Sequence, residues 1–364
     1  MPIQYPDYKN CLANLACSVL KYFDITPPNS TYKPADELLS KEYRNVIIIL
    51  LDGMGTNIME KHLSKDGFFR SHFRCSLSST FPPTTVAATT AIRSGLFPNQ
   101  SCWLGWVGYF KQLDRNIVYF HSTDHDDKSV AFSKDPAETL FPYKSVVEQI
   151  NEAGGEAHFI SPFVDPKPHG LNEILEEVKK RCKSPQKKYI YAYCDQPDYS
   201  LHLMGTDDKY IGELVFDFER QIKLLSEQLE DSLIIVTADH GHTNIVNKTI
   251  TDYPEICECF TRMPSIEARA VNMFIKSERL QDFSAIFNRY FGDPFMLLSK
   301  KEVFEKGLFG SGTNDPRFED MIGDFLAVAT GNVALNTYEK TYKSNHAGLM
   351  EDEMNVPFIV VETK

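Results

Sequence analysis

Side chains that can bind a metal ion stand beside four aliphatic runs of the sequence. They are Asp52 after the run 46–51, Asp198 and His202 after 189–193, Asp239 and His240 after 233–237, and His346 before 357–361. Polar residues that follow the strands of an open α/β sheet lie where such sheets bind their ligands. Carboxylates and imidazoles together form a donor set that suits Zn²⁺ or a similar divalent ion. The pattern therefore predicts a metal site at one edge of a sheet.

Each of these residues, taken alone, has a purely structural explanation. An Asp after a strand is commonly a cap or turn residue, and a single His is commonly a packed or surface residue. The occurrence of all six residues in one sequence is a more specific sign of a metal site than any one of them alone. Asp198 and His202 are four residues apart, so one helical turn would place both on the same face, where they can share an ion.

A hydroxyl nucleophile is available in the segment 78–98. Pro82 and Pro83 end an extended stretch, a helix is expected to begin at Thr84 or Thr85, and Gly95 is expected to end it. The N-terminus of a helix offers free N–H groups and the positive end of the dipole, which favour a phosphate group and an ionised nucleophile. Thr80, Thr84 and Thr85 all qualify on these grounds. The alternative, that these threonines only cap the helix, stays open at this point.

The elements that must position these groups alternate between strands and helices. Aliphatic runs are predicted as strands, and stretches such as 143–153 and 211–229 have helical periodicity. This order is typical of an α/β doubly wound fold, with a mostly parallel sheet and helices on both faces. The regular alternation of strands and helices changes between residues 253 and 338, which predicts a small inserted α+β lobe. The predicted organisation is an N-terminal helical segment at 1–42, a catalytic core at 43–252 and 339–364, and the lobe at 253–338.

Four motifs carry a resemblance to a known group of proteins. They are LLDGMG at 50–55, CDQPDYSLH at 194–202, TADHGH at 237–242 and SNHAGL at 344–349. In this order they resemble the alkaline phosphatase superfamily, most closely its branch of type I phosphodiesterases and nucleotide pyrophosphatases. The likeness spans residues 46–241 and returns at 346–361. It implies an alkaline phosphatase-like core that holds two divalent ions, with Zn²⁺ expected and Mn²⁺ as the alternative.

The resemblance also assigns roles to individual residues. One ion would be held by Asp52, Asp239 and His240 together with Thr85, and the other by Asp198, His202 and His346. In the superfamily the nucleophile lies ten positions before the Gly of a Ser/Thr-Gly pair. Here that pair is Ser94-Gly95, which selects Thr85. The TFP at 80–82 is similar to the nucleophile motif of nucleotide pyrophosphatases, so Thr80 remains the rival.

The implied activity is hydrolysis of phosphodiester or pyrophosphate bonds in a small, nucleotide-like substrate through a phosphothreonine. A phosphomonoesterase or phosphonate hydrolase is the enzymatic alternative, and a catalytically silent metal-binding module is the alternative from another class. Trp106 stands where the pyrophosphatases carry a phosphate-contacting Asn, and His242 stands where an apolar residue is common. Arg93 lies about 12 Å along the helix from Thr85, and the lack of a nearer arginine favours diesters.

Bulk properties exclude several other classes. The net charge is −12 and basic residues do not cluster with aromatic ones, so no nucleic acid polymer is expected as a partner. The longest aliphatic run, 46–51, is far shorter than the roughly 20 residues of a membrane span, and no secretory signal is recognisable. We expect a cytoplasmic protein without a membrane association, with its eight cysteines reduced. The sequence carries no prediction of oligomeric state.

Overall fold

Unbroken aliphatic runs form the centre of a six-stranded sheet. The computed structural model describes residues 2–364, so Met1 of the predicted segment 1–42 lies outside it. Every residue is buried in β1 (Asn45–Leu51), β7 (Lys188–Cys194) and β8 (Ser232–Thr237). Runs without alternation suit such strands because helices cover both of their faces.

The central sheet has the strand order β2-β17-β8-β1-β7-β6. Its other strands are β2 (Phe73–Ser78), β6 (Glu156–Ile160) and β17 (Asn355–Thr363). β1 runs parallel to β7 and β8, and β7 runs parallel to β6. β17 is antiparallel to both of its neighbours, β8 and β2. The predicted mostly parallel α/β sheet is confirmed, with β17 as the strand that makes it mixed.

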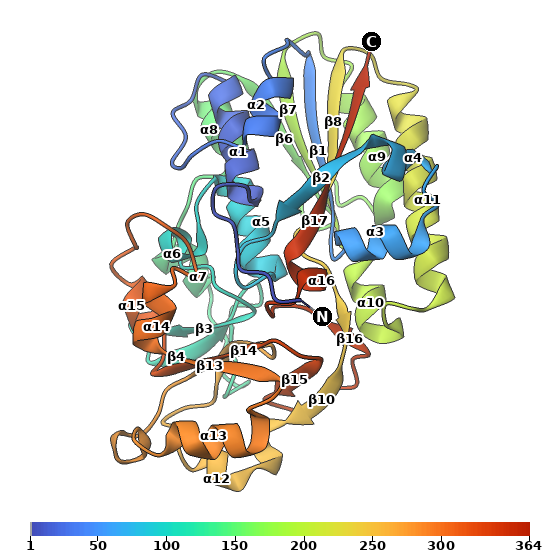
Figure 1. Ribbon diagram of the computed structural model, residues 1–364. Coiled ribbons are helices and arrows are strands. Elements are labelled where there is room, and N and C mark those ends of the chain that lie inside the picture. Colours follow the sequence, from blue (N-terminus) through green and yellow to red (C-terminus); the bar gives the residue numbers. More distant parts are fainter. Residues whose placement is uncertain (1) are drawn as a thin grey trace.

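Helices cover both faces of this sheet (Figure 1). On one face α1 packs against α5 and α8, and on the other α11 packs against α3, α4 and α9. The bounds on the first face are α1 (Leu12–Tyr22), α2 (Lys33–Leu38), α5 (Thr85–Ser94) and α8 (Val146–Glu152). Those on the second are α3 (Thr56–His62), α4 (Phe68–His72), α9 (Gly170–Arg181) and α11 (Lys209–Ser226). None of the helices within 2–364 has the length and apolarity to cross a membrane.

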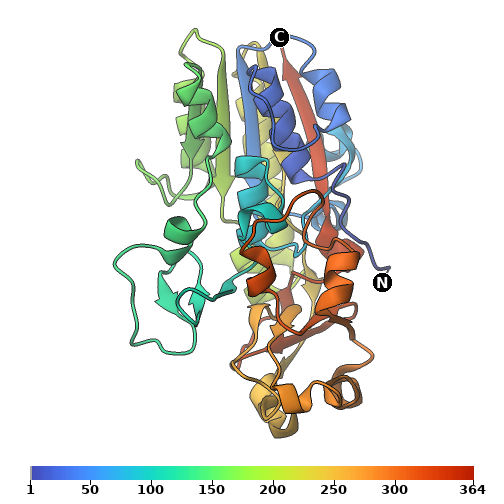
Figure 2. The same ribbon diagram turned by 90° about the vertical axis from the view of Figure 1, so that its left-hand side faces the viewer.

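The second sheet is antiparallel and has the order β13-β14-β12-β11-β3-β4-β5. Its strands are β3 (Val107–Phe110), β4 (Arg115–Val118), β5 (Thr123–Asp124), β11 (Ser265–Glu267), β12 (Ala270–Met273), β13 (Phe295–Ser299) and β14 (Phe325–Ala329). It therefore joins the predicted lobe segment 253–338 to an earlier segment, 107–124, that the sequence placed in the core. Figure 2 shows this earlier, blue-green segment at the side of the orange one. Strands of two to four residues are too short to show a clear alternation, which is why the sequence did not reveal them.

Shorter elements complete the chain. They are α6 (Pro98–Ser101), α7 (Pro136–Leu140), β9 (Thr243–Asn244), β10 (Val246–Thr249), α12 (Pro254–Cys257), α13 (Phe283–Phe291), α14 (Lys300–Glu305), α15 (Phe318–Met321), β15 (Val333–Asn336), β16 (Ser344–Asn345) and α16 (Glu351–Met354). α10 (Asp198–Met204) follows β7 directly and begins with one of the predicted metal ligands.

A buried ion pair ties the second sheet to the segment that follows His346. Arg269 and Glu353 are both fully buried, and Arg269 Nε and Nη2 donate to Glu353 Oε1 and Oε2 at 2.7 Å each. Arg269 Nη1 donates to the carbonyls of Gly331 and Val333. Glu353 Oε1 also accepts the N–H of Gly348 at 2.8 Å. The pair thus fixes the second sheet against the chain that carries one of the predicted ligands.

Candidate metal centre

The first group of predicted ligands gathers at the carboxyl ends of β1 and β8. Asp52, Asp239 and His240 are buried, and one ligand atom from each lies within 4.8 Å of the others. His240 Nε2 is 3.4 Å from Asp52 Oδ1 and 3.5 Å from Asp239 Oδ2. These three residues leave the ends of neighbouring parallel strands, which explains why they meet.

Backbone and tyrosine contacts orient the two carboxylates of this group. The N–H groups of Gly53 and His240 donate to Asp239 Oδ1, and the hydroxyl of Tyr193 donates to Asp52 Oδ2. The opposite oxygens, Asp52 Oδ1 and Asp239 Oδ2, are buried and accept no hydrogen bond from any residue in 2–364. A buried carboxylate oxygen without a partner is costly. Both free oxygens face His240 Nε2, so this arrangement fits a cation held between them.

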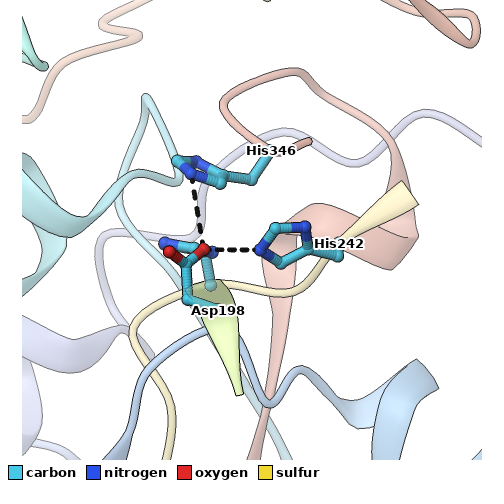
Figure 3. A group of neighbouring side chains, drawn as sticks. Asp198, His242 and His346 are labelled. Carbon is cyan, nitrogen blue, oxygen red and sulfur yellow. Dashed lines mark hydrogen bonds and ion pairs between the residues drawn. The ribbon is translucent and has the colours of Figure 1, made fainter. Parts of the chain in front are cut away.

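The second group centres on Asp198 at the start of α10. His242 and His346 face the carboxylate of Asp198, and Figure 3 shows both imidazoles directed toward it. His242 Nε2 lies 2.6 Å from Asp198 Oδ1, His202 Nε2 lies 3.4 Å from it, and His346 Nε2 lies 3.8 Å from it. Asp198, His240, His242 and His346 can offer ligand atoms within 4.8 Å of one another. Both groups thus form candidate metal-binding clusters, consistent with a site for two metal ions.

The four histidines share one orientation. Nδ1 faces a carbonyl oxygen in three of them: Ser344 for His202, Gly241 for His240 and Pro83 for His346. In His242 it faces Ser344 Oγ, whose own hydrogen is donated to the carbonyl of Leu201. Because these oxygens only accept, each Nδ1 donates to its partner, and each ring directs Nε2 to the centre. Partners of this kind fix the tautomer and direction of metal-binding histidines.

The contact between His242 and Asp198 is a further test of the fit. Two unprotonated acceptors, a neutral Nε2 and a carboxylate oxygen, repel each other at 2.6 Å. A shared proton removes the repulsion at this hydrogen-bonding distance, and an ion bound by both atoms would remove it with the two atoms further apart. The residues of both clusters therefore fit a divalent metal ion. Asp52 and Asp239 would hold an ion with His240, and Asp198 would hold one with His242 and His346. The predicted ligand His202 lies beside Asp198 but outside both groups.

The two groups differ in the pKa shifts of their carboxylates. Burial raises the pKa of Asp52 well above its usual value, and the neighbouring charges of Asp239 and Asp198 add to the rise. Burial also acts to raise the pKa of Asp198, and only the protonated form of the histidines around it would outweigh burial and hold that pKa well below its usual value. Burial lowers the pKa of His242 to about 3 and that of His346 well below its usual value. Neutral histidines are the form that binds metal.

Thr85 lies next to the first group, at the first residue of α5. Its Oγ1 is 3.3 Å from His240 Nε2 and 3.5 Å from Asp52 Oδ2. No side chain in the described chain caps the first turn of α5, so its amides remain free for an anion. Thr84 Oγ1 instead donates to Glu267, and Thr80 Oγ1 is buried with no partner in 2–364. Of the three candidate threonines, Thr85 therefore has the contacts that a nucleophile at this centre requires.

A cleft of about 620 Å³ opens in front of Thr85 and contains Asp198, His202 and His346 in its wall. Glu267, at the end of β11, lies in the same wall and accepts hydrogen bonds from Thr84 Oγ1 at 2.6 Å and from the N–H of Trp106 at 2.8 Å. Burial raises the pKa of Glu267 to about 7. Trp106 stands where an Asn was expected, and its backbone amide donates to the carboxylate of Glu267. Its side chain is 42% exposed and packs against His121, so it is directed outward.

Fold and site together define a class of protein. A threonine beside two carboxylate and histidine clusters, on an α/β core with a separate antiparallel sheet, is the arrangement of a metal-dependent hydrolase with an alkaline phosphatase-like fold. The chain belongs to the type I phosphodiesterase / nucleotide pyrophosphatase family, which it matches over residues 157–346. The family assignment made from the four motifs is thereby confirmed, and small phosphate esters are the substrates that the family implies. No curated protein matches the chain significantly.

Solved structures share the fold at low sequence identity. Murine ectonucleotide pyrophosphatase / phosphodiesterase 5 is similar with a TM-score of 0.64 and 14% identity over 87% of this chain and 88% of that one. The human protein of the same name gives a TM-score of 0.65 at 14% identity over 87% of both chains. Phosphonoacetate hydrolase from Sinorhizobium meliloti 1021 gives 0.65 at 15% identity over 88% of this chain and 91% of that one.

The structure brings all six predicted ligands and Thr85 into one centre, and their roles as ligands and nucleophile remain predictions. It adds two residues that the sequence did not assign. His242, which stands where an apolar residue is common, is fully buried against Asp198. Glu267 comes from the second sheet, 182 positions after Thr85, and no local motif marks it.

His242 is expected to strengthen metal binding at Asp198. Replacing it with alanine removes an imidazole that faces the carboxylate at 2.6 Å, and we expect added Zn²⁺ to bind roughly 10- to 100-fold more weakly at this cluster. Competition with a chromophoric chelator measures this affinity without any assay of activity. His169→Ala, at an exposed position, is the matched control. Equal affinities of both variants and the wild type would show that His242 takes no part in the metal site.

Proposed function

We propose that the protein hydrolyses phosphodiester or pyrophosphate bonds in small, nucleotide-like substrates, with Thr85 as the nucleophile and Zn²⁺ as the native metal. The observation that carries this proposal is the position of Thr85 Oγ1, within 3.5 Å of Asp52 Oδ2 and 3.3 Å of His240 Nε2 at the start of α5. Mixed carboxylate and imidazole donors support zinc over harder ions such as Mg²⁺.

The chemistry divides into two displacements. Divalent ions at such a site polarise phosphoryl oxygens and lower the pKa of hydroxyl groups. The oxygen of Thr85 forms a bond to phosphorus while the bond to the leaving oxygen breaks, and the hydroxyl proton of Thr85 passes by way of solvent to the leaving oxygen. Water then attacks the same phosphorus and releases the second product, which restores Thr85. The free amides at the N-terminus of α5 favour a negatively charged phosphoryl group beside it.

The charge of the cleft favours diesters over monoesters. A dianionic monoester gains from an arginine that binds two of its oxygens. Among the described residues, no arginine lines this cleft, and Arg93 lines a different cavity. Glu267 instead presents a carboxylate close to Thr84, which disfavours a second negative charge on the substrate. A diester carries only one.

Cleft size and lining support a nucleotide-like leaving group. Tyr199, Tyr338 and Tyr342 line the cleft of about 620 Å³ and can pack against a planar ring. The murine relative with the similar fold has also been solved in complex with AMP. These observations support the nucleotide class without selecting one member of it.

One observation favours a second candidate, a phosphonate hydrolase. Lys128 and Lys340 line the cleft and could bind a second anionic group of the substrate. The Sinorhizobium meliloti phosphonoacetate hydrolase was solved in complex with phosphonoacetate, which carries such a group. Release of phosphate from phosphonoacetate, lost on Lys128→Ala and Lys340→Ala replacement, would support this candidate.

The proposal is tested by turnover of bis(4-nitrophenyl) phosphate relative to 4-nitrophenyl phosphate by zinc-loaded protein. We expect a ratio well above one, and a further rise with pH, because Glu267 ionises above its pKa of about 7 and then repels the dianionic monoester. The Glu267→Gln variant, which keeps the shape but not the charge, should lower the ratio several-fold and remove its rise through this range.

The controls separate the outcomes. Glu258→Gln, a change on the surface outside the cleft, should leave the ratio unaltered. A ratio below one in the wild type would assign the protein to the phosphomonoesterases instead. If the ratio is high and Glu267→Gln does not change it, the protein is still a diesterase, but Glu267 is not the cause of its preference.

A further inference from the structure

A second cavity, of about 220 Å³, lies between helices α5 and α8 and strands β6 and β7. None of the residues that line it also lines the metal cleft. Its walls are aromatic and aliphatic and consist mainly of Phe159, Tyr189, Tyr191, Val146 and Val147. Phe159 and Tyr191 stack at 5.5 Å with their rings 18° apart, so one wall of the cavity is flat.

Arg93 supplies a positive charge to this cavity. It lines the cavity from the last turn of α5, and its guanidinium lies 4.6 Å from the ring centre of Phe159. Among residues 2–364 its side chain forms no ion pair and no hydrogen bond, although, beside the hydrogen bonds from Ser145, its charge is near enough to lower the pKa of Glu148. Glu148, the acidic residue at the cavity, is exposed, and its Oε2 is taken by the N–H and hydroxyl of Ser145. Arg93 therefore keeps its donors free.

Tyr191 provides the independent sign of a ligand. Its side chain lines the cavity and is 2% exposed, yet its hydroxyl has no hydrogen-bond partner among the described residues. A buried hydroxyl without a partner is unfavourable by about 1–3 kcal/mol in proteins. Tyr193, two residues along the same face of β7, satisfies its hydroxyl with Asp52, whereas the hydroxyl of Tyr189, which also lines the cavity, has no partner among the described residues either.

The geometry points to this cavity as a binding site for a small organic carboxylate with a planar or branched apolar body. The guanidinium of Arg93 binds the carboxylate in the two-pronged manner that suits this pair. The hydroxyl of Tyr191 donates to the ligand, and the stacked rings of Phe159 and Tyr191 hold its body. An apolar cavity of about 150 Å³ accommodates benzene, so about 220 Å³ accommodates a benzene ring with a carboxylate.

Isothermal titration of the zinc-loaded full-length protein with benzoate, phenylacetate and 3-methylbutyrate tests this inference. We expect at least one of them to bind with one equivalent per chain at concentrations below about 10 mM. Arg93→Leu should weaken its binding by about tenfold or more, Arg93→Lys by less, and Tyr191→Phe severalfold. Benzyl alcohol, which lacks the charge, should bind much more weakly than benzoate.

Two controls keep the result specific. Asp198→Asn changes the metal centre, so unchanged carboxylate affinity in this variant excludes binding to the metals. Arg181→Leu removes an exposed arginine elsewhere on the surface and should also leave the affinity unchanged. Absence of binding for all three carboxylates, or equal binding by the wild type and both Arg93 variants, would overturn the inference.

Discussion

Replacement of Thr85 by alanine is expected to lower turnover of a phosphodiester by roughly 10⁴-fold or more while leaving metal binding almost intact. The change removes the oxygen that attacks phosphorus, and the loss of a covalent nucleophile is among the largest single effects known in enzymes. The clusters around Asp52 and Asp198 retain all of their carboxylate and imidazole ligands in this variant. Steady-state rates and metal content are measured on the same preparation.

Three companion variants make this result specific to Thr85. Thr85→Ser keeps a hydroxyl and should retain a measurable part of the activity. Thr80→Ala and Thr84→Ala test the rival threonines and should keep turnover within about tenfold of the wild type, since neither hydroxyl faces His240. Acid quenching of the wild type during turnover should trap a phosphate on the peptide that contains Thr85. Activity in Thr85→Ala together with its loss in Thr80→Ala would reverse the assignment.

The second large effect is expected on stability, from the buried pair of Arg269 and Glu353. Arg269→Met removes one partner and leaves the Glu353 carboxylate buried without a counter-charge, which costs about 3–5 kcal/mol of unfolding free energy. Urea denaturation followed by intrinsic fluorescence measures the loss. Because Glu353 also accepts the N–H of Gly348, two residues beyond His346, weaker metal binding should accompany it.

A surface pair supplies the control for this prediction. Arg289 and Glu255 form an ion pair at 3.0 Å in which the arginine side chain is 60% exposed. Pairs of this kind contribute about 1 kcal/mol or less, so Arg289→Met should be nearly neutral. The double replacement Arg269→Met with Glu353→Leu should recover part of the loss, since no unpaired charge remains. If Arg269→Met lowered the free energy of unfolding no more than Arg289→Met, the buried pair would not contribute the predicted stability.

The predictable part of the fold was the part encoded by continuous apolar runs. β1 matches the run 45–51 because a strand covered on both faces needs no polar positions. β2 (Phe73–Ser78) went unrecognised because most of its positions are not buried, and its pairing with β17 joins residues about 280 apart. β3 to β5 are too short for a periodic signal and acquire their place only through pairing with β11.

The same distinction holds for the candidate site. Asp52 and Asp239 could be located because each stands directly after a strand, where neighbouring parallel strands bring such residues together. His242 could not, since its burial depends on Ser344, 102 residues further along the chain. Glu267 reaches Thr84 only because the second sheet folds against the start of α5. Contacts between distant segments cannot be recognised from the local spacing of residues. Such contacts determine the charge of the cleft.

The most direct test of the central claim is a titration of metal-free protein with Zn²⁺ while hydrolysis of bis(4-nitrophenyl) phosphate is followed. Since two clusters flank Thr85, activity should be absent without metal, rise with added ion and reach its plateau at two equivalents per chain. Full activity in the metal-free protein, or a plateau at a single equivalent, would contradict a hydrolase that works with two metal ions.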